Sequence, residues 1–363
     1  MEIKDSMIAT LPVKPQEKTN IGMMLAPTIM DYLGTVLQID KNFGINVLHS
    51  YDDKESLMDG YIEYLKKSGI NYNSVFVDSS YADQLLEIIE RMYMNDQLKI
   101  KNKEILRCDC GRVDMIYSLH NNGKLYTENN GQIICNYCDS ECRKYKEKVL
   151  VFEIKKDNEN ISITPTYLKK EISRFQSTYD GKDIIVSKFR DTGYALETSA
   201  GVFNIDIDFL WMNYFKLFDK TNQIYVASNH QLFVMYLMNQ LARTTSEKKL
   251  TFIANPYVNC NLETAKRQYE KRELEAYKKL LLLYNLKWKN KDCNWSDSNY
   301  QFLSNISDTK IKNLYNSMII SAREMYREDL PIDEILNQIL RQTTNMQDNI
   351  NIMKKLYKSG KLD

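Results

Sequence analysis

The sequence lacks any apolar run approaching the roughly 20 residues that a membrane-spanning helix needs. Its first residues, Met1 to Asp5, also lack the basic stretch followed by apolar residues that opens a secretory leader. We therefore expect a cytoplasmic protein with no membrane partner.

The chain has almost no net charge, because 49 Lys and Arg residues stand against 48 Asp and Glu residues. Its overall charge gives no sign of a polyanionic partner, although local basic faces could still bind RNA. The 363 residues exceed what one ordinary core needs. We therefore expect a large α/β domain with an appended piece.

Cysteine is sparse, but its spacing is informative. Two short pairs lie 24 residues apart and are followed by one more cysteine: Cys108, Cys110, Cys135, Cys138, Cys142. The two pairs supply the four soft ligands of a tetrahedral structural Zn²⁺, with Cys142 as the alternative to Cys138. Disulfides would need an oxidising compartment, which nothing in the sequence indicates. We predict a zinc ribbon, with hairpin turns at the Asn-Asn-Gly sequences 121–123 and 129–131.

Up to about residue 240, apolar runs of strand length alternate with segments of helical spacing. The expected strands are residues 21–26, 45–48 and 74–77. The expected helices are residues 30–41, 54–67 and 82–94. This alternation predicts an α/β fold with a Rossmann-like, doubly wound parallel sheet. Such sheets bind ligands at the carboxyl ends of their strands, which here are residues 26–32 and 49–53.

Beyond residue 262 the pattern becomes helical, with expected helices at residues 263–286, 308–327, 332–342 and 345–358. The charge of this region is mixed, so a structural bundle or a dimerisation surface is as consistent with it as RNA recognition. We expect four parts in all. They are a first half of the catalytic domain (1–100), a zinc-ribbon insertion (101–150), a second half of that domain (151–260) and a helical C-terminal domain (261–363).

The segment from Leu25 to Thr35 resembles the first signature of class I aminoacyl-tRNA synthetases, where a strand runs through a proline loop into a His-Ile-Gly-His motif. In this register Tyr32-Leu33-Gly34-Thr35 occupies the motif. The segment Asn46–Asp53 resembles the family's second strand, after which polar residues face the amino-acid pocket. The order of elements is similar to that in the glutamyl, methionyl and class I lysyl branches. The run Cys110–Asp114 looks most like the class I lysyl ribbon.

Three later segments continue the resemblance, which covers about residues 20–245: Ile185–Gly193, Asn204–Trp211 and Gln223–Met238. The first is similar to the stretch that re-enters the catalytic sheet after the insertion. The second resembles an acidic and aromatic segment that follows it. The third looks like the strand-to-helix element whose turn lies against ATP and the amino acid in the family.

The chain departs from the family pattern at two places. Tyr32 and Thr35 stand where the family has two histidines that contact the ATP phosphates. The family's Lys-Met-Ser-Lys-Ser loop, which clamps the leaving pyrophosphate, has no clear counterpart, and the nearest candidate is Thr244–Lys249.

The resemblance implies roles for eight residues. They are catalytic (Tyr32, Thr35, His230), nucleotide-binding (Pro27, Gly34, Asn229) and substrate-binding (Asp52, Asp53). Some of them have an equally simple structural explanation. A histidine at a helix start is often a packed residue, and paired aspartates there are favourable to the helix dipole.

The function implied is ATP-dependent activation of an amino acid to an aminoacyl adenylate, with transfer to tRNA as the further step. Zn²⁺ would be structural, and Mg²⁺ would accompany ATP. The alternative is a degenerate synthetase paralogue that binds nucleotide, amino acid or tRNA without aminoacylation. A third hypothesis is an unrelated Rossmann-like protein whose ribbon binds nucleic acid.

Overall fold

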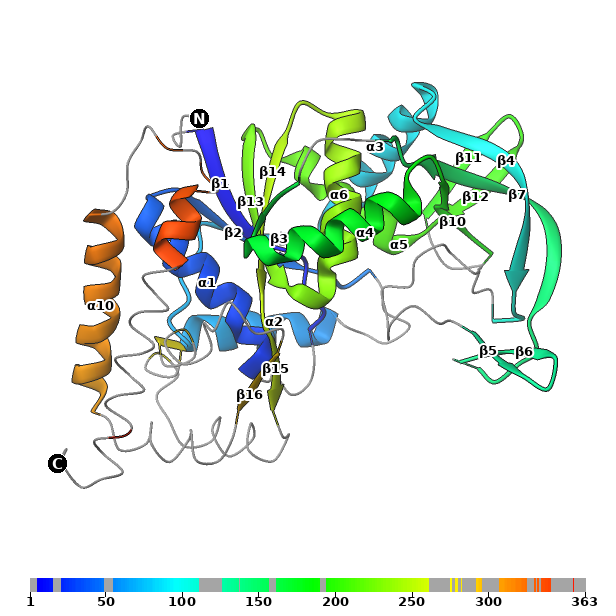
Figure 1. The fold of residues 1–363 in the computed structure, drawn as a ribbon. Helices are drawn as coiled ribbons and strands as arrows, with labels where there is room; N and C mark the ends of the chain where they lie inside the picture. The colour runs from blue at the N-terminus through cyan, green and yellow to red at the C-terminus, as the bar shows by residue number, and fades with distance from the viewer. Residues whose placement is uncertain are drawn as a thin grey trace.

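The computed structural model describes residues 5–15, 21–48, 55–110, 126–136, 138–156, 161–189 and 194–260. Beyond residue 260 it describes residues 292–295, 307–324 and 334–340 and the single positions 275, 278, 279, 282, 330, 332 and 355. At its centre lies a six-stranded sheet in the order β3-β2-β1-β13-β14-β8 (Figure 1). Its strands are β1 (Ser6–Thr10), β2 (Asp40–Ile45), β3 (Ser74–Val77), β8 (Ser162–Thr164), β13 (Asn222–Ser228) and β14 (Lys249–Asn255). Every neighbouring pair is parallel, as the sequence predicts.

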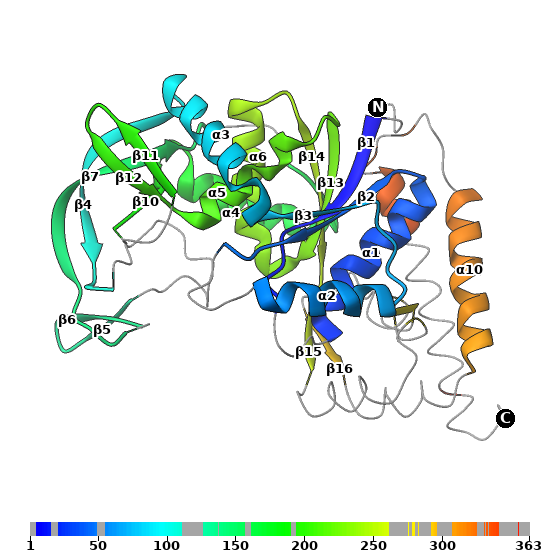
Figure 2. The ribbon, with the colours of Figure 1, turned by 180° about the vertical axis from the view of Figure 1, so that it is seen from behind.

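Helices cover both faces of this sheet (Figures 1 and 2). Because strand side chains alternate, Met7 and Ala9 of β1 join one apolar core and Ile8 joins the other. The first core includes α3 (Ala82–Met94), α4 (Lys169–Tyr179), α5 (Ile207–Met212) and α6 (Leu232–Thr245). The second includes α1 (Ile21–Leu37) and α2 (Glu55–Lys67). The predicted doubly wound α/β class is therefore confirmed. Within the described residues, no helix combines the length and apolarity that crossing a membrane would need.

The first stretch of α1 contradicts the predicted strand over residues 21–26. An apolar run of this length fits a buried strand or a buried helix equally well, and here it opens a helix that continues through Pro27. Proline has no N–H to donate to the carbonyl four residues earlier. The Tyr61 hydroxyl of α2 donates to that carbonyl, the Met23 oxygen, at 3.3 Å instead. The neighbouring helix thus supplies the missing donor.

Other element predictions have mixed outcomes. The strand at residues 74–77 and the helix at 82–94 are confirmed as β3 and α3, and the helix at 54–67 is confirmed as α2 within one residue. The predicted strand at 45–48 is wrong, since β2 ends at Ile45. The sequence also failed to indicate β1, whose five residues are all buried.

A long antiparallel arm leaves the sheet between α3 and β8. It pairs β4 (Leu98–Arg107) with β7 (Arg143–Glu153), from Leu98 opposite Phe152 to Arg107 opposite Arg143. The hairpin of β5 (Tyr126–Asn129) and β6 (Gln132–Cys135) lies at its far end (Figure 1). Its two turn residues, Asn130 and Gly131, have positive φ angles, which confirms the turn predicted at 129–131. The other predicted turn, at 121–123, lies outside the described residues.

Further short strands complete the region between arm and C-terminus. Strand β9 (Asp183–Ile185) joins the arm at β7, and β10 (Ser187–Lys188), β11 (Tyr194–Thr198) and β12 (Gly201–Ile205) form a separate sheet. Beyond β14, the strand β15 (Tyr257–Cys260) pairs with β16 (Asp292–Trp295).

The C-terminal region packs on the outer face of α1. The predicted helix at 308–327 is confirmed over α10 (Asp308–Glu324), and residues 334–340 are also helical. The Tyr315 ring of α10 lies 6.0 Å from that of Tyr32. The predicted helices at 263–286 and 345–358 fall almost entirely outside the described residues.

Candidate active site

A cavity of about 290 Å³ opens at the carboxyl ends of the central strands. Its lining comes from the chain after β1, the first turns of α1, the ends of β13 and β14, and α5: Leu11, Pro12, Val13, Lys14, Gly22, Met23, Ala26, Asn46, Asp208, Trp211, Val226, Ala227, Ser228, Gln231 and Asn255. Strand order reverses between β1 and β13, so this is the switch point at which doubly wound sheets bind ligands. The volume suits a small ligand.

Backbone hydrogen bonds hold the pocket walls together after the strands end. The Leu11 N–H donates to the Val226 carbonyl at 3.2 Å, which joins the chain leaving β1 to β13. The Val13 N–H donates to the Gly44 carbonyl at 3.0 Å, and the Asn46 N–H donates to the Val13 carbonyl at 2.9 Å. These bonds extend the ladder beyond the sheet and bring Asn46 into the lining.

A polar network lies at one side of the pocket. The indole Nε1 of Trp211 donates to Asp208 Oδ1 at 3.0 Å. With the Asn46 amide turned to satisfy both of its neighbours, its oxygen also accepts from Trp211 Nε1 at 2.8 Å and its nitrogen donates to Asp78 Oδ2 at 3.3 Å. Asp78 is fully buried, and its other oxygen accepts from the Val47 and Leu48 N–H groups. The network fixes Asp208, which is the only carboxylate among the described lining residues.

The opposite charge comes from the first turn after β1 and from α1. Lys14 is the only cation among those lining residues that the structure describes. Gly22 and Met23 lie in the first turn of α1, a 17-residue helix, so its amino-terminal end faces the pocket. The partial positive charge of a helix N-terminus favours anions such as phosphate. The pocket therefore offers one negative and one positive region.

Asn229 and His230 lie in the chain between the lining residues Ser228 and Gln231. The Ser228 hydroxyl accepts from the His230 N–H at 3.3 Å and fixes the turn after β13. Asn229 is 9 % exposed, whereas His230 is exposed and its ring stacks on Tyr257. Neither residue is among the described lining residues, and their predicted roles remain predictions.

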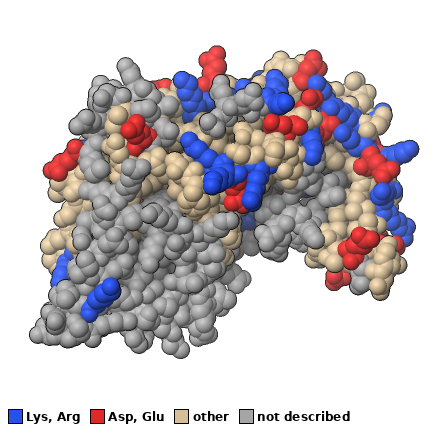
Figure 3. All heavy atoms as spheres, in the orientation of Figure 1, with Lys and Arg blue, Asp and Glu red and all other residues tan. Residues whose placement is uncertain are grey.

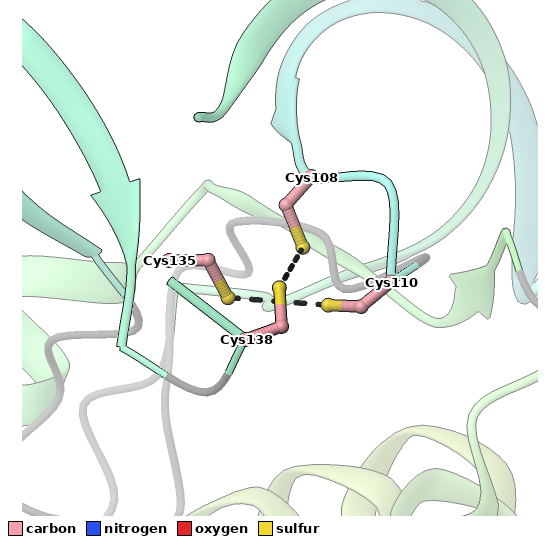
Figure 4. A group of neighbouring side chains, drawn as sticks. All are labelled: Cys108, Cys110, Cys135 and Cys138. Carbon is pink, nitrogen blue, oxygen red and sulfur yellow. Dashed lines mark hydrogen bonds between the residues drawn. The ribbon is translucent and has the colours of Figure 1, made fainter. Parts of the chain in front are cut away.

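Four cysteines converge at the end of the arm (Figure 4). The Sγ atoms of Cys108, Cys110, Cys135 and Cys138 all lie within 4.8 Å of one another. Cys110 and Cys135 are 3.9 Å apart and Cys138 and Cys108 are 4.0 Å apart, close to the edge of about 3.8 Å expected for a tetrahedron with Zn–S bonds of about 2.3 Å. The geometry therefore fits Zn²⁺, and this set contains Cys138 in place of Cys142. None of the described cysteines forms a disulfide.

The comparisons with known proteins find similar structures but no match to a protein-family model or a curated protein. No protein-family model matches the chain, and no curated protein matches it either. Methionyl-tRNA synthetase from Mycobacterium tuberculosis in complex with methionyl-adenylate is similar in structure, with a TM-score of 0.63 and 12 % identity over 88 % of this chain and 73 % of that one. The free enzyme gives a TM-score of 0.61 and 11 % identity over 95 % and 80 %.

This chain has the class I aminoacyl-tRNA synthetase fold. The similar structures named above are methionyl enzymes, so the likeness of the ribbon to the class I lysyl branch remains a prediction.

Tyr32, Gly34 and Thr35 are not among the described residues that line the pocket. Tyr32 is 1 % exposed beneath α10, and a Cβ on Gly34 would meet the Lys41 side chain. The Thr35 hydroxyl donates to Asp31 Oδ1 at 3.3 Å. The motif register behind these three residues depended on the strand predicted at 21–26, and that strand is a helix.

The remaining predicted site residues are Pro27, Asp52 and Asp53. Pro27 follows the lining residue Ala26 in α1 but does not itself line the cavity. Asp52 and Asp53 lie outside the described residues. Their predicted contact with substrate stays a prediction.

Sequence patterns predict no site role for five of the lining residues: Lys14, Gly22, Asp208, Trp211 and Asn255. For Asp208 and Trp211 a signal existed, since both lie in the acidic and aromatic segment that resembles the family. Lys14 and Gly22 could have been found from the apolar run that forms β1, because the chain leaving a first strand faces the switch point.

Proposed function

We propose that this chain activates an amino acid with ATP to form an aminoacyl adenylate, as a class I synthetase-like ligase that then transfers the aminoacyl group to tRNA. The observation that carries the proposal is a pocket with one negatively charged and one positively charged region, at the switch point of a sheet with the class I synthetase fold. Fold similarity at 11 to 12 % identity supports the architecture, and the pocket chemistry supports the activity.

In this proposal the two charged regions of the pocket hold the two substrates. The Asp208 carboxylate would hold the ammonium group of the amino acid, because Trp211 and Asn46 fix it in place. Lys14 and the N-terminus of α1 would face the triphosphate, and Gly22 has no side chain to keep phosphate from the helix end. Mg²⁺ would enter bound to ATP and reduce the charge of its phosphates.

The chemistry is an in-line displacement. The carboxylate oxygen of the amino acid forms a bond to the α-phosphorus of ATP, the bond to the bridging oxygen breaks, and pyrophosphate leaves. Such a reaction depends mostly on positioning and on stabilising charge. The residues of this pocket can supply both without a general base.

An RNA acceptor is supported by positively charged side chains on α4. Figure 3 shows Lys and Arg side chains gathered over α4. This helix carries Lys169, Lys170 and Arg174, and none of them forms an ion pair with a described residue. On the arm, by contrast, Lys101 and Lys103 pair with Asp183. Unpaired cations of the α4 kind can contact RNA phosphates.

The direct test is amino-acid-dependent exchange of pyrophosphate into ATP, measured with each of the common amino acids. Exchange with one amino acid supports the proposal and names the substrate. Asp208→Asn should raise the KM for that amino acid, whereas Lys170→Ala, which is remote from the pocket lining, should leave exchange unchanged. Absence of exchange by folded protein with every amino acid would contradict the proposal.

A second candidate, a paralogue that binds without activating, is favoured by one observation. The α1 residues that face the pocket are Gly22, Met23 and Ala26, and no described lining residue is a histidine. The described lining therefore contains no imidazole that could take the place of the two histidines of the family motif. This candidate predicts saturable binding of ATP or amino acid by dialysis together with no pyrophosphate exchange.

For the cysteine cluster we propose structural Zn²⁺. Four sulfur ligands leave no open position for a substrate, which is typical of structural sites. Purified protein should contain one zinc ion per chain by elemental analysis. Cys138→Ser should lose the metal and Cys142→Ser should keep it. The reverse result would make Cys142 the fourth ligand.

A further inference from the structure

An exposed aromatic pair lies beside the pocket. The rings of His230 and Tyr257 are nearly parallel, with an angle of 8° between their planes and 4.1 Å between their centroids. Both side chains are exposed, and Tyr257 retains 41 % of its surface. One face of each ring is covered by the other ring, and neither outer face stacks on another described aromatic residue.

The chain places this pair at the pocket margin. His230 lies between the lining residues Ser228 and Gln231, and Tyr257 follows the lining residue Asn255 by two positions. Strands β13 and β14, which carry these turns, are parallel neighbours paired up to Ser228 opposite Asn255. The stack therefore spans the ends of two adjacent strands at the edge where the cavity opens.

A second feature of this wall is a buried hydrogen-bond acceptor. Asn255 is 3 % exposed and lines the cavity, and its Nδ2 donates to the Pro256 carbonyl at 2.9 Å. Its Oδ1 accepts no hydrogen bond from the part of the chain that the structure describes. A buried amide oxygen left without a donor is destabilising, so a ligand donor at this point would be favoured.

We propose that the outer face of the His230–Tyr257 pair stacks on the adenine ring of ATP, with Asn255 Oδ1 accepting from the adenine amino group. Bases stack well on aromatic side chains. The exocyclic amino group of adenine is a donor where guanine has an acceptor oxygen, so Asn255 would select ATP over GTP. This inference rests on the proposed function, because it takes ATP to be the ligand of the same pocket.

The test measures dissociation constants by equilibrium dialysis for ATP, GTP and inorganic triphosphate. Tyr257→Ala should raise the ATP dissociation constant about tenfold, equivalent to about 1.4 kcal/mol, and leave that of inorganic triphosphate unchanged. Tyr257→Phe should keep ATP affinity, since it keeps the ring. Tyr167→Ala serves as the matched control, because Tyr167 is similarly exposed at 37 % and lies outside the pocket lining.

Asn255 has its own readout. Wild-type protein should bind ATP more tightly than GTP, and Asn255→Leu should lower that preference about tenfold without changing the binding of inorganic triphosphate. Because Asn255 also contacts the Pro256 carbonyl, thermal unfolding must show that the variant folds. If the Asn255→Leu variant does not fold, the variants of the exposed Tyr257 still test the proposal.

The outcomes separate this inference from the proposed function. If exchange occurs but Tyr257→Ala binds ATP as the wild type does, the stacking proposal is overturned and the activity stands. If ATP binding depends on Tyr257 but exchange is absent, the stacking proposal stands and the activity fails. If Tyr257→Ala weakens only the binding of a short RNA that ends in adenosine, the proposal is overturned. It is also overturned if the wild type binds no ATP.

Discussion

The two ends of α1 have different partners, although they belong to one continuous helix. At its start, Gly22, Met23 and Ala26 line the pocket. Ten residues later, Asp31, Tyr32 and Thr35 contact β2 and the C-terminal region instead. The comparison shows that residues of one helix can be close in sequence and still serve separate purposes, one for ligand and one for packing.

The far end of α1 is held by a buried ion cluster. Asp31 is 1 % exposed and pairs with Lys278, at 2.5 Å, and with Lys41, at 2.9 Å. The Asn71 N–H also donates to it at 3.2 Å. Burial alone would raise the pKa of Asp31, but the charges and hydrogen bonds of Lys278 and Lys41 hold that pKa below its ordinary value.

The largest effect is therefore expected at Asp31. Asp31→Ala leaves Lys278 buried without its carboxylate, so we expect about 3–5 kcal/mol less free energy of unfolding. Urea unfolding measures this loss. If the two ends of α1 are separate in function, ATP affinity per folded molecule should not change. A tenfold loss of ATP affinity in folded protein would contradict that separation.

The same pair gives a pH dependence. The pKa of Asp31 is lowered in the folded protein, so its contribution to stability is complete above the unfolded-state pKa, near 3.9, and is lost as pH falls through the folded-state value. We expect stability to fall below about pH 4 in the wild type. Asp31→Asn should remove part of this acid sensitivity in urea unfolding measured from pH 3 to 7.

For Asp208 of α5, which lines the same pocket as the start of α1, we expect a larger effect on ligand binding than on stability. Asp208→Asn removes the only carboxylate in the described part of the lining, so we expect about 1.5–3 kcal/mol weaker binding of the amino acid. Stability should change by less, because asparagine can still accept from Trp211. Calorimetric titration with the amino acid identified by exchange measures the first effect. Loss of stability with unchanged binding would contradict the proposed binding role of Asp208.

A smaller effect is expected at Gly34. A Cβ there would collide with Lys41 Cγ and would lie 3.0 Å from Ile8 Cγ2. The lysine can move, so we expect Gly34→Ala to destabilise the fold by about 1–3 kcal/mol without changing ATP affinity. Thermal unfolding and dialysis test the two halves of this prediction. A selective loss of ATP affinity would instead support the nucleotide role that the resemblance implies for Gly34.

The smallest effect is expected at Tyr32. Tyr32→Phe keeps the buried ring against Tyr315 and removes only a hydroxyl, so we expect a change of about 1 kcal/mol or less in stability. Pyrophosphate exchange should continue at the wild-type rate. A large fall in exchange rate would place Tyr32 in catalysis and count against the pocket described above.

These contrasts also show how far the sequence could lead. Spacing alone predicted the cysteine cluster, because its ligands form two local pairs and need only one hairpin to meet. The apolar run of residues 21–26 could not be assigned in this way, since burial on several sides removes the alternation that separates strand from helix. Asp208 and Asn46 meet only through the fold, so their contact through Trp211 had no local signal.

The proline within α1 makes the effects of residues 27 and 61 on stability depend on each other. Met23 lines the pocket, and its carbonyl receives the Tyr61 hydroxyl because residue 27 has no N–H. Replacing Tyr61 by phenylalanine should therefore lower the free energy of unfolding less when residue 27 is alanine than when it is proline. A double-mutant cycle on unfolding free energy measures this coupling, and additivity of the two changes would refute it. Compensatory change at these two positions would thus preserve the wall of the pocket without altering any residue that faces it.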